Sequence, residues 1–245
     1  MDLRDAVDTI GSAGTAIIDA GRASPDGPVA TCPGWTVMTV VKHVGGVHRW
    51  AAAVLVAPSP DEPPAFPKAD RSLDGPALLD WADEARHVLL ATLAHTDPER
   101  PVWAFGPTRP ARFWWRRQAH ETAIHAWDAT MAVGERWSMP TDVAADGIDE
   151  LLEWALPRRW ADAPPLWGRD RTIHLHRTDG EGEWLIRLGA VPAVERGHAK
   201  GDLAVRGPAV ELLAWASNRS VPGAAGVELF GDVALAEDWK AHVAF

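Results

Sequence analysis

The chain has 245 residues, 47% of them hydrophobic and 24% charged, which is the composition of a folded globular protein and a length that suits two domains. Its formal net charge of −10 and pI near 5.4 argue against a basic surface that would bind nucleic acid or an anionic membrane. A single cysteine, Cys32, excludes an internal disulfide and a cysteine-rich zinc ribbon, so any other reacting thiol would come from outside the chain.

The start of the sequence does not resemble an export signal. Residues 1–5 contain two aspartates, and no basic segment there leads into an apolar stretch. No uninterrupted apolar run approaches the roughly 18–20 residues of a membrane span. We therefore expect a soluble, cytoplasmic protein that acts on small molecules rather than on nucleic acid or a membrane.

Four segments in the first half carry apolar residues at helical spacing. Gly21 suits the end of the first helix, and Thr36 can cap the start of the second. Residues 97–110 are expected to form a loop. Four amphipathic helices of this length predict a four-helix bundle over residues 1–135. The expected helices cover residues 2–22, 36–55, 72–94 and 111–132.

The second half changes from helical to mixed patterns. A helix is expected from residue 140 to about residue 156, and two segments with alternating polarity follow, joined by a turn that contains Gly180 and Gly182. These features predict a smaller α+β domain over residues 140–245. Its other expected elements are a strand at 204–206, a helix at 208–217, a strand at 227–230 and a helix at 235–242, and the hairpin strands cover 171–177 and 183–188.

One helix carries a candidate metal-binding pair. Glu121 and His125 are four residues apart and so share a helix face, whereas His120 and His125 are five apart and do not form the HExxH pattern. A carboxylate and an imidazole suit Zn²⁺ or a similar ion, although the same spacing is also common for a solvated ion pair. A third ligand must come from another helix, and periodicity slightly favours His48 over His43.

Four further residues, Asp128, Cys32, His174 and His176, could have structural roles. Asp128 lies three residues after His125, and we hypothesise that it hydrogen-bonds to the ligand set and orients it, the alternative being a surface carboxylate. Cys32 is expected to be a small buried residue. His174 and His176 share one face of a strand, which an exposed sheet face explains as well as a binding site does.

Two sequence motifs occur in this order along the chain. They are Thr31-Cys32-Pro33-Gly34-Trp35-Thr36-Val37, with His43 following, and Arg116-Arg117-Gln118-Ala119-His120-Glu121-Thr122-Ala123-Ile124-His125-Ala126-Trp127-Asp128-Ala129. Together they resemble the mycothiol-dependent maleylpyruvate isomerase family of DinB-like metalloenzymes. The resemblance covers nearly the whole chain and implies a DinB-like four-helix bundle followed by a smaller α+β domain similar to sterol carrier proteins.

The resemblance also implies a site and a reaction. It assigns His43, Glu121 and His125 as ligands of Zn²⁺ or another divalent transition metal, with an open position for the cosubstrate mycothiol, activated as a zinc-bound thiolate. The implied reaction is isomerisation of a small electrophile such as maleylpyruvate, or transfer of the thiol to it. The family also has a functional arginine in its C-terminal domain, for which Arg219 is the first candidate and Arg206 and Arg187 are alternatives.

Two other functions stay open. A metal site of this kind could activate water instead of a thiol, which would make the protein a hydrolase. A sterol-carrier-like domain could hold an apolar ligand in a non-catalytic binding or regulatory protein. Activity that depends on mycothiol would distinguish the thiol-dependent enzyme from a hydrolase. Tight binding of apolar ligands that does not depend on metal would instead indicate the non-catalytic binding protein.

Overall fold

The computed structural model describes residues 1–67, 72–161, 171–189, 191–220 and 226–242, and only the backbone of residues 159–161 and 242. The chain divides into two compact units, Met1–Ser138 and Met139–Phe245. We propose that these units are the two domains, for which the sequence predicts the ranges 1–135 and 140–245. Within the described ranges, no helix is both long and apolar enough to cross a membrane.

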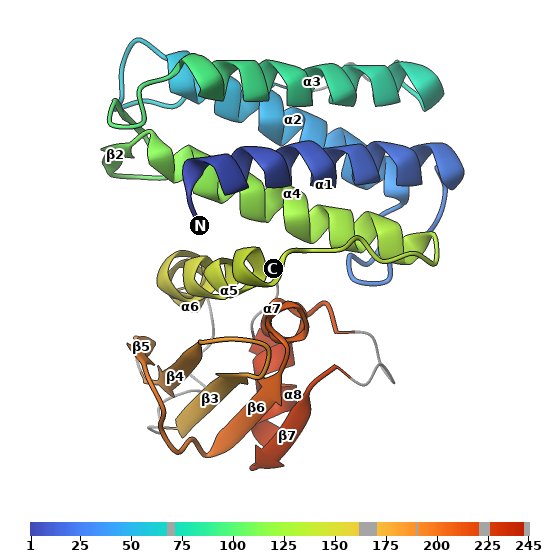
Figure 1. The fold of residues 1–245 in the computed structure, drawn as a ribbon. Coiled ribbons are helices and arrows are strands. Elements are labelled where there is room, and N and C mark those ends of the chain that lie inside the picture. The colour runs from blue at the N-terminus through green and yellow to red at the C-terminus, as the bar shows by residue number, and fades with distance from the viewer. Residues whose placement is uncertain (68–71, 162–170, 190, 221–225, 243–245) are drawn as a thin grey trace. The chain divides into compact units, whose positions relative to one another are not determined.

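The first unit is the predicted four-helix bundle (Figure 1). Helix α1 packs against α3 and α4, and α2 packs against the same two helices. The predicted third helix begins three residues late, because Asp74 occupies the N-cap position and Pro76 lies in the first turn. The helices are α1 (Leu3–Ala23), α2 (Val37–Val56), α3 (Gly75–His95) and α4 (Arg112–Ala132).

The start of α2 is fixed by a capping box. The Thr36 side chain accepts a hydrogen bond from the Thr39 backbone N–H at 3.3 Å, and the Thr39 hydroxyl accepts one from the Thr36 N–H at 3.3 Å. The predicted cap at Thr36 is therefore confirmed. Because this cap sets where the helix begins, it also sets the face on which His43 emerges two turns later.

The bundle core contains two apolar clusters. One cluster gathers at the end that contains the start of α2, and the other lies at the opposite end beside an aromatic group. Fully buried members of the first cluster include Ile17, Val37, Val40 and Val41, and those of the second include Ile10, Leu55, Leu89 and Trp114.

The connection between α3 and α4 is not the simple loop that the sequence predicts. It contains two antiparallel three-residue strands, β1 (Pro101–Trp103) and β2 (Thr108–Pro110). Such short strands show no alternation in sequence, which explains why they were missed. The Trp114 indole N–H donates to the Trp103 carbonyl at 2.8 Å, so this hairpin is tied to the first turn of α4.

The second unit is built on a five-stranded sheet with the order β5-β4-β3-β6-β7 (Figure 1). Strands β3 and β6 are parallel and every other neighbouring pair is antiparallel, so the predicted β3–β4 hairpin is confirmed. Strand β5 was missed because its four residues are mostly exposed and lack an apolar alternation. The strands are β3 (Arg171–Arg177), β4 (Glu183–Leu188), β5 (Ala193–Arg196), β6 (Leu203–Gly207) and β7 (Glu228–Gly231).

Helices complete the second unit as a layer against the sheet. Helix α7 packs against α5 and contacts β3 and β6, and the Trp239 indole of α8 donates to the Ala216 carbonyl at 2.9 Å. The helix predicted over 140–156 runs on to residue 161 through a π-helical turn. Its parts are α5 (Thr141–Glu150), the π turn (Leu151–Ala155) and α6 (Leu156–Ala161), and the later helices are α7 (Ala209–Ala216) and α8 (Ala234–His242). The predicted fold class, a helical bundle followed by an α+β part, is confirmed.

Candidate metal centre

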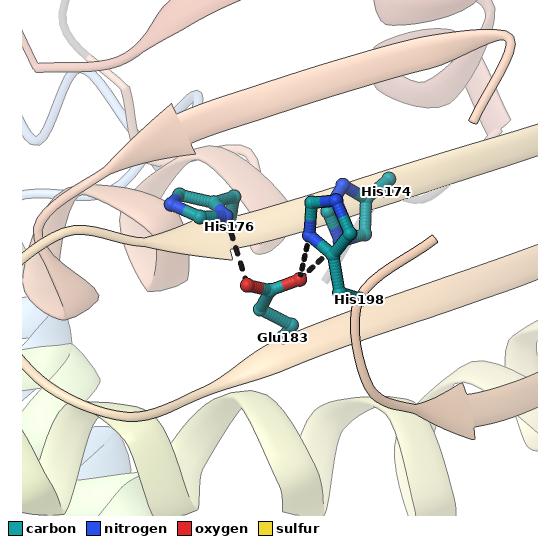
Figure 2. A group of neighbouring side chains, drawn as sticks. All are labelled: His174, His176, Glu183 and His198. Carbon is teal, nitrogen blue, oxygen red and sulfur yellow. Dashed lines mark hydrogen bonds and ion pairs between the residues drawn. The ribbon is translucent and has the colours of Figure 1, made fainter. Parts of the chain in front are cut away.

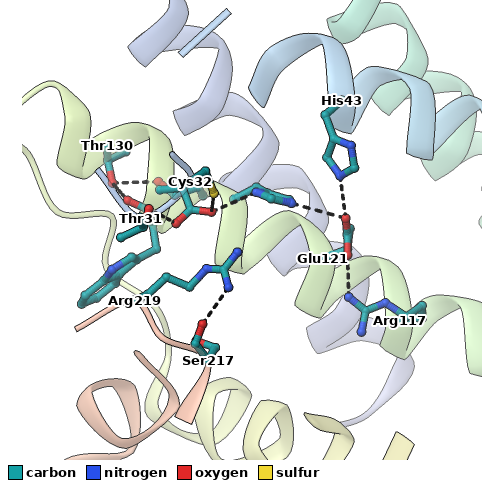
Figure 3. Close-up of polar contacts among 12 residues, drawn as sticks. Thr31, Cys32, His43, Arg117, Glu121, Thr130, Ser217 and Arg219 are labelled. Carbon is teal, nitrogen blue, oxygen red and sulfur yellow. Dashed lines mark hydrogen bonds and ion pairs between the residues drawn. The ribbon is translucent and has the colours of Figure 1, made fainter. Parts of the chain in front are cut away.

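His43, Glu121 and His125 come together between α2 and α4 of the first unit. The His43 Nε2 lies 3.0 Å from the Glu121 Oε1, and the His125 Nε2 lies 3.4 Å from the same oxygen. Figure 3 shows the Glu121 carboxylate between His43 and Arg117. The sequence explains the convergence, because Glu121 and His125 are one turn apart on α4 and His43 faces them from α2.

The donor set fits a divalent transition metal. Two imidazole nitrogens and one carboxylate oxygen are ligands that Zn²⁺ and its neighbours accept. Donors at bond lengths of about 2.0–2.2 Å around a tetrahedral ion lie about 3.4 Å from one another. The observed separations of 3.0 and 3.4 Å are close to that value, and the three donor atoms lie within 4.8 Å of one another.

Asp128 supports His125 from the side away from Glu121. The His125 Nδ1 lies 3.0 Å from the Asp128 Oδ2, and the Asp128 side chain is buried. A carboxylate can only accept here, so Nδ1 carries a proton, and Nε2 is the nitrogen that faces Glu121 and would bind a metal ion after losing its own proton. The hydrogen bond hypothesised for Asp128 is present, and the alternative of a surface carboxylate is wrong.

The segment before α2 holds Asp128 in turn. The Thr31 hydroxyl donates to the Asp128 Oδ1 at 2.6 Å, and the Cys32 thiol donates to the Asp128 Oδ2 at 3.5 Å. Cys32 is half-buried rather than buried, and its sulfur joins His125 and Asp128 in a second compact group of potential ligand atoms. The only thiol of the chain thus donates a hydrogen bond to a carboxylate.

Trp35 covers both imidazoles. Its ring stacks on His125 at a centroid distance of 5.9 Å and an interplanar angle of 14°, and it lies 5.1 Å from the His43 ring. Gly34 adopts a φ of +84°, a conformation that favours glycine, and the Trp35 N–H donates to the Cys32 carbonyl at 3.0 Å. This turn explains the Pro33-Gly34-Trp35 part of the motif, a role that helical spacing could not indicate.

The site is strongly polarised. Burial alone would raise the pKa of Glu121, but hydrogen bonds from His125 and His43 and the charge of Arg117, 2.6 Å away, hold it well below its ordinary value. Burial alone would lower the pKa of His125, but its hydrogen bonds to Asp128 and Glu121 outweigh burial and raise it to about 9. The group is therefore an ionised network in which both oxygens of Glu121 have a cationic or imidazole partner.

His48 lies elsewhere, although periodicity slightly favoured it. Its side chain is buried in the bundle, and its Nε2 donates to the Thr122 hydroxyl at 2.8 Å, which in turn donates to the Gln118 carbonyl. Burial lowers the pKa of His48 to about 3, so it is neutral. Its central position on the apolar stripe of α2 is the reason for both its burial and the misleading periodicity.

The three candidate arginines differ in their surroundings within the second unit. Arg219 is buried just after α7, and its Nη1 donates to the Ser217 carbonyl at 2.8 Å (Figure 3). Arg206 and Arg187 form ion pairs on the sheet surface, with Glu228 at 3.0 Å and with Glu195 at 2.8 Å. Only Arg219 among the three is removed from solvent.

Comparison with known proteins follows the same division of the chain. Residues 7–130 match the model of the mycothiol maleylpyruvate isomerase N-terminal domain, and residues 142–238 match that of the C-terminal domain of the same family. No curated protein sequence matches the chain.

Solved structures give the fold. The mycothiol-dependent maleylpyruvate isomerase crystal structure has a TM-score of 0.63 at 16% identity, covering 94% of this chain and 93% of that chain. A variant of that enzyme with a histidine replaced by alanine has a TM-score of 0.64 at 15% identity, with the same coverage. A ubiquinone synthesis protein described as UbiJ-SCP2 has a TM-score of 0.29 at 14% identity, covering 43% of this chain and 93% of that chain. Since the two family models span both units, the chain belongs to the mycothiol maleylpyruvate isomerase family.

Proposed function

We propose that this protein is a metal-dependent enzyme that uses a low-molecular-weight thiol, mycothiol, to isomerise a small electrophile such as maleylpyruvate or to attach the thiol to it. The observation that carries the proposal is the convergence of His43, Glu121 and His125 on one space, with Asp128 behind His125. Membership of the family supplies the thiol and the substrate class.

The proposed ligands are His43, Glu121 and His125, holding Zn²⁺ or another divalent transition metal. When bound, such an ion would lower the pKa of an incoming thiol from its ordinary value of about 8.5. Three protein ligands leave a position for that thiol, as in catalytic rather than structural sites. The chain's own thiol at Cys32 is engaged with Asp128, which is consistent with a thiol supplied from outside.

The chain's residues position this chemistry. Asp128 fixes the ring of His125, and Arg117 orients the second oxygen of Glu121 at 2.6 Å. Trp35 covers the imidazoles and keeps water from one side of the site. These contacts join residues of the chain itself, so side chains held in this way need little reorganisation during the reaction.

The reaction follows from the chemistry of a thiolate and a conjugated double bond. Addition of the thiolate to one carbon of a cis double bond places the electron pair on the conjugated carbonyl, and the former double bond can then rotate as a single bond. Return of the electron pair expels the thiolate and leaves the trans isomer. If a proton is added instead, the thiol stays attached and the enzyme is a thiol transferase.

Arg219 is our proposed partner for a substrate carboxylate, because a guanidinium can bind a carboxylate through two parallel hydrogen bonds. Arg219→Lys and Arg219→Ala should both raise KM for a carboxylate substrate, since neither keeps the two-point contact. Arg206→Ala removes a surface arginine of the same unit and serves as the control. Equal KM values for wild type and both Arg219 variants would remove this role.

The first experiment measures metal content by elemental mass spectrometry on protein purified without an affinity tag, together with conversion of maleylpyruvate with and without mycothiol. We expect activity that requires both metal and mycothiol and that is lost in His43→Ala and Glu121→Gln but kept in His95→Ala, a control at an exposed histidine. Mass analysis of the product distinguishes isomerisation from thiol transfer. Turnover without mycothiol would favour a hydrolase, and a folded protein that takes up no metal at this centre would refute the proposal.

A further inference from the structure

Three histidines surround one carboxylate in the second unit (Figure 2). His174 and His176 come from β3, Glu183 begins β4, and His198 follows β5. Their potential ligand atoms all lie within 4.8 Å of one another. None of the four belongs to the motifs that carry the family resemblance, and the candidate centre of the first unit does not use them.

The contacts all converge on Glu183. Its Oε2 lies 3.1 Å from the His174 Nε2 and 2.8 Å from the His198 Nδ1, and its Oε1 lies 3.1 Å from the His176 Nδ1. The three imidazole rings are mutually close, with centroid distances between 5.7 and 6.4 Å. Each ring therefore directs a nitrogen to the same small space.

The sheet accounts for three of these positions. Alternation along β3 puts His174 and His176 on one face, and the register of the hairpin pairs His176 with Glu183. His174 is buried, so the exposed sheet face considered for the two histidines is wrong at that position.

The backbone also holds the connection that carries His198. Gly197 has a φ of +126°, and its N–H donates to the Glu183 carbonyl at 3.1 Å. Gly201 passes so close to β3 that a Cβ there would lie 2.8 Å from the His174 backbone nitrogen. The segment 197–201 is thus anchored at both ends against the hairpin. These backbone contacts fix the position of His198 next to the Glu183 carboxylate.

The group contains more histidines than are needed to neutralise Glu183. One carboxylate is neutralised by one imidazolium, and additional protonated imidazoles at these distances would repel one another. Three neutral imidazoles and one carboxylate are instead a complete ligand set for a tetrahedral ion.

We propose that His174, His176, Glu183 and His198 form a closed, four-ligand site for Zn²⁺ that joins the β5–β6 connection to the β3–β4 hairpin. Four protein ligands leave no open position, so this site would be structural rather than catalytic. It is independent of the function proposed for the first unit.

The test counts zinc on the chelator-treated, untagged full chain by calorimetric titration with zinc sulfate. In a His43→Ala/His125→Ala background, which removes the candidate centre of the first unit, we expect one zinc per chain. Adding His176→Ala/His198→Ala should abolish that zinc or weaken its binding by at least about tenfold, a change of 1.4 kcal/mol. Adding His87→Ala/His95→Ala instead, at two exposed histidines outside the group, should leave it unchanged.

A conservative pair guards against misfolding. Glu183→Gln keeps the shape of the side chain but removes its charge and should weaken zinc binding, whereas Glu195→Gln on the neighbouring strand, where the carboxylate pairs with Arg187, should not. Amide hydrogen exchange gives a second readout, because zinc should slow exchange in residues 197–202 of the wild type but not of His198→Ala. A background variant that binds no zinc, or binds it equally after loss of His176 and His198, would overturn the proposal.

Discussion

The contact between Asp128 and His125 makes a quantitative prediction about metal affinity. In Asp128→Asn the side chain keeps its size, but the amide can turn an N–H donor toward the His125 Nδ1 where the carboxylate could only accept. That arrangement favours the tautomer with the proton on Nε2, the nitrogen that faces Glu121 and would have to bind the ion. We expect zinc affinity to fall although no ligand has been changed.

The size of the effect follows from the structure. The bond is 3.0 Å long, it joins an imidazole to a carboxylate, and the carboxylate is 1% exposed, so solvent cannot replace it. A hydrogen bond to a charged group is worth about 1.5–3 kcal/mol. Loss of such a supporting contact in a metal site lowers affinity by about 10–100-fold, or about 1.4–2.7 kcal/mol.

Competition with a chromophoric chelator measures this affinity directly. Thr31→Val is the matched control, because it removes the 2.6 Å hydrogen bond to the other oxygen of Asp128 but leaves the His125 contact in place. It should weaken zinc binding less than Asp128→Asn does. The reasoning fails if Asp128→Asn binds zinc as tightly as the wild type, or if Thr31→Val is equally impaired.

Other predictions concern the stability of the bundle. Burial lowers the pKa of His48 to about 3 from an ordinary value of 6.5. Below pH 6.5 the unfolded chain therefore binds a proton at His48 that the folded chain does not bind, so the free energy of unfolding decreases as the pH is lowered. His48 should account for a loss of about 2 kcal/mol between pH 7.5 and pH 5 in denaturant unfolding, and His48→Gln should show a correspondingly shallower pH dependence; parallel curves would contradict this. Gly45→Ala should cost about 1–3 kcal/mol, because its Cβ would lie 2.6 Å from the Trp81 ring and 3.0 Å from the α3 backbone, and an unchanged urea midpoint would refute it. Gly34→Ala meets no atom within 4 Å, but the φ of +84° should still cost about 1 kcal/mol, measured in the same way and refuted by a gain in stability.

The sequence predicted the long helices well because their signal is repeated over many turns. The apolar spacing and the cap at Thr36 are local properties, and the structure has both. The three-residue strands β1 and β2 and the exposed strand β5 were missed because they depend on pairing with distant segments and carry no periodic signal of their own.

The residues of the sites were predictable to different degrees. Spacing placed Glu121 and His125 on one face of a helix, but the same logic favoured His48 over His43. A stripe of apolar residues marks the core, where His48 is buried, whereas the proposed ligand His43 is partly exposed at its edge. The resemblance to a family assigns His43 instead, and His43 is the histidine of α2 that lies beside Glu121. In the second unit, His174 and His176 were noticed as neighbours, whereas Glu183 and His198 join them only through strand register and a glycine-bounded connection.

The short segment before α2 explains why the first motif is more informative than the ligand spacing. Thr31 and Cys32 hold Asp128, Trp35 covers the imidazoles, and Thr36 caps α2 and thereby sets the face on which His43 appears. None of these residues is a proposed ligand, yet each constrains one. A turn that must satisfy all of these contacts at once tolerates few sequences, whereas a glutamate and a histidine four residues apart occur on many helices. The residues around the proposed ligands therefore distinguish this centre from other helical Glu–His pairs better than the proposed ligands themselves do.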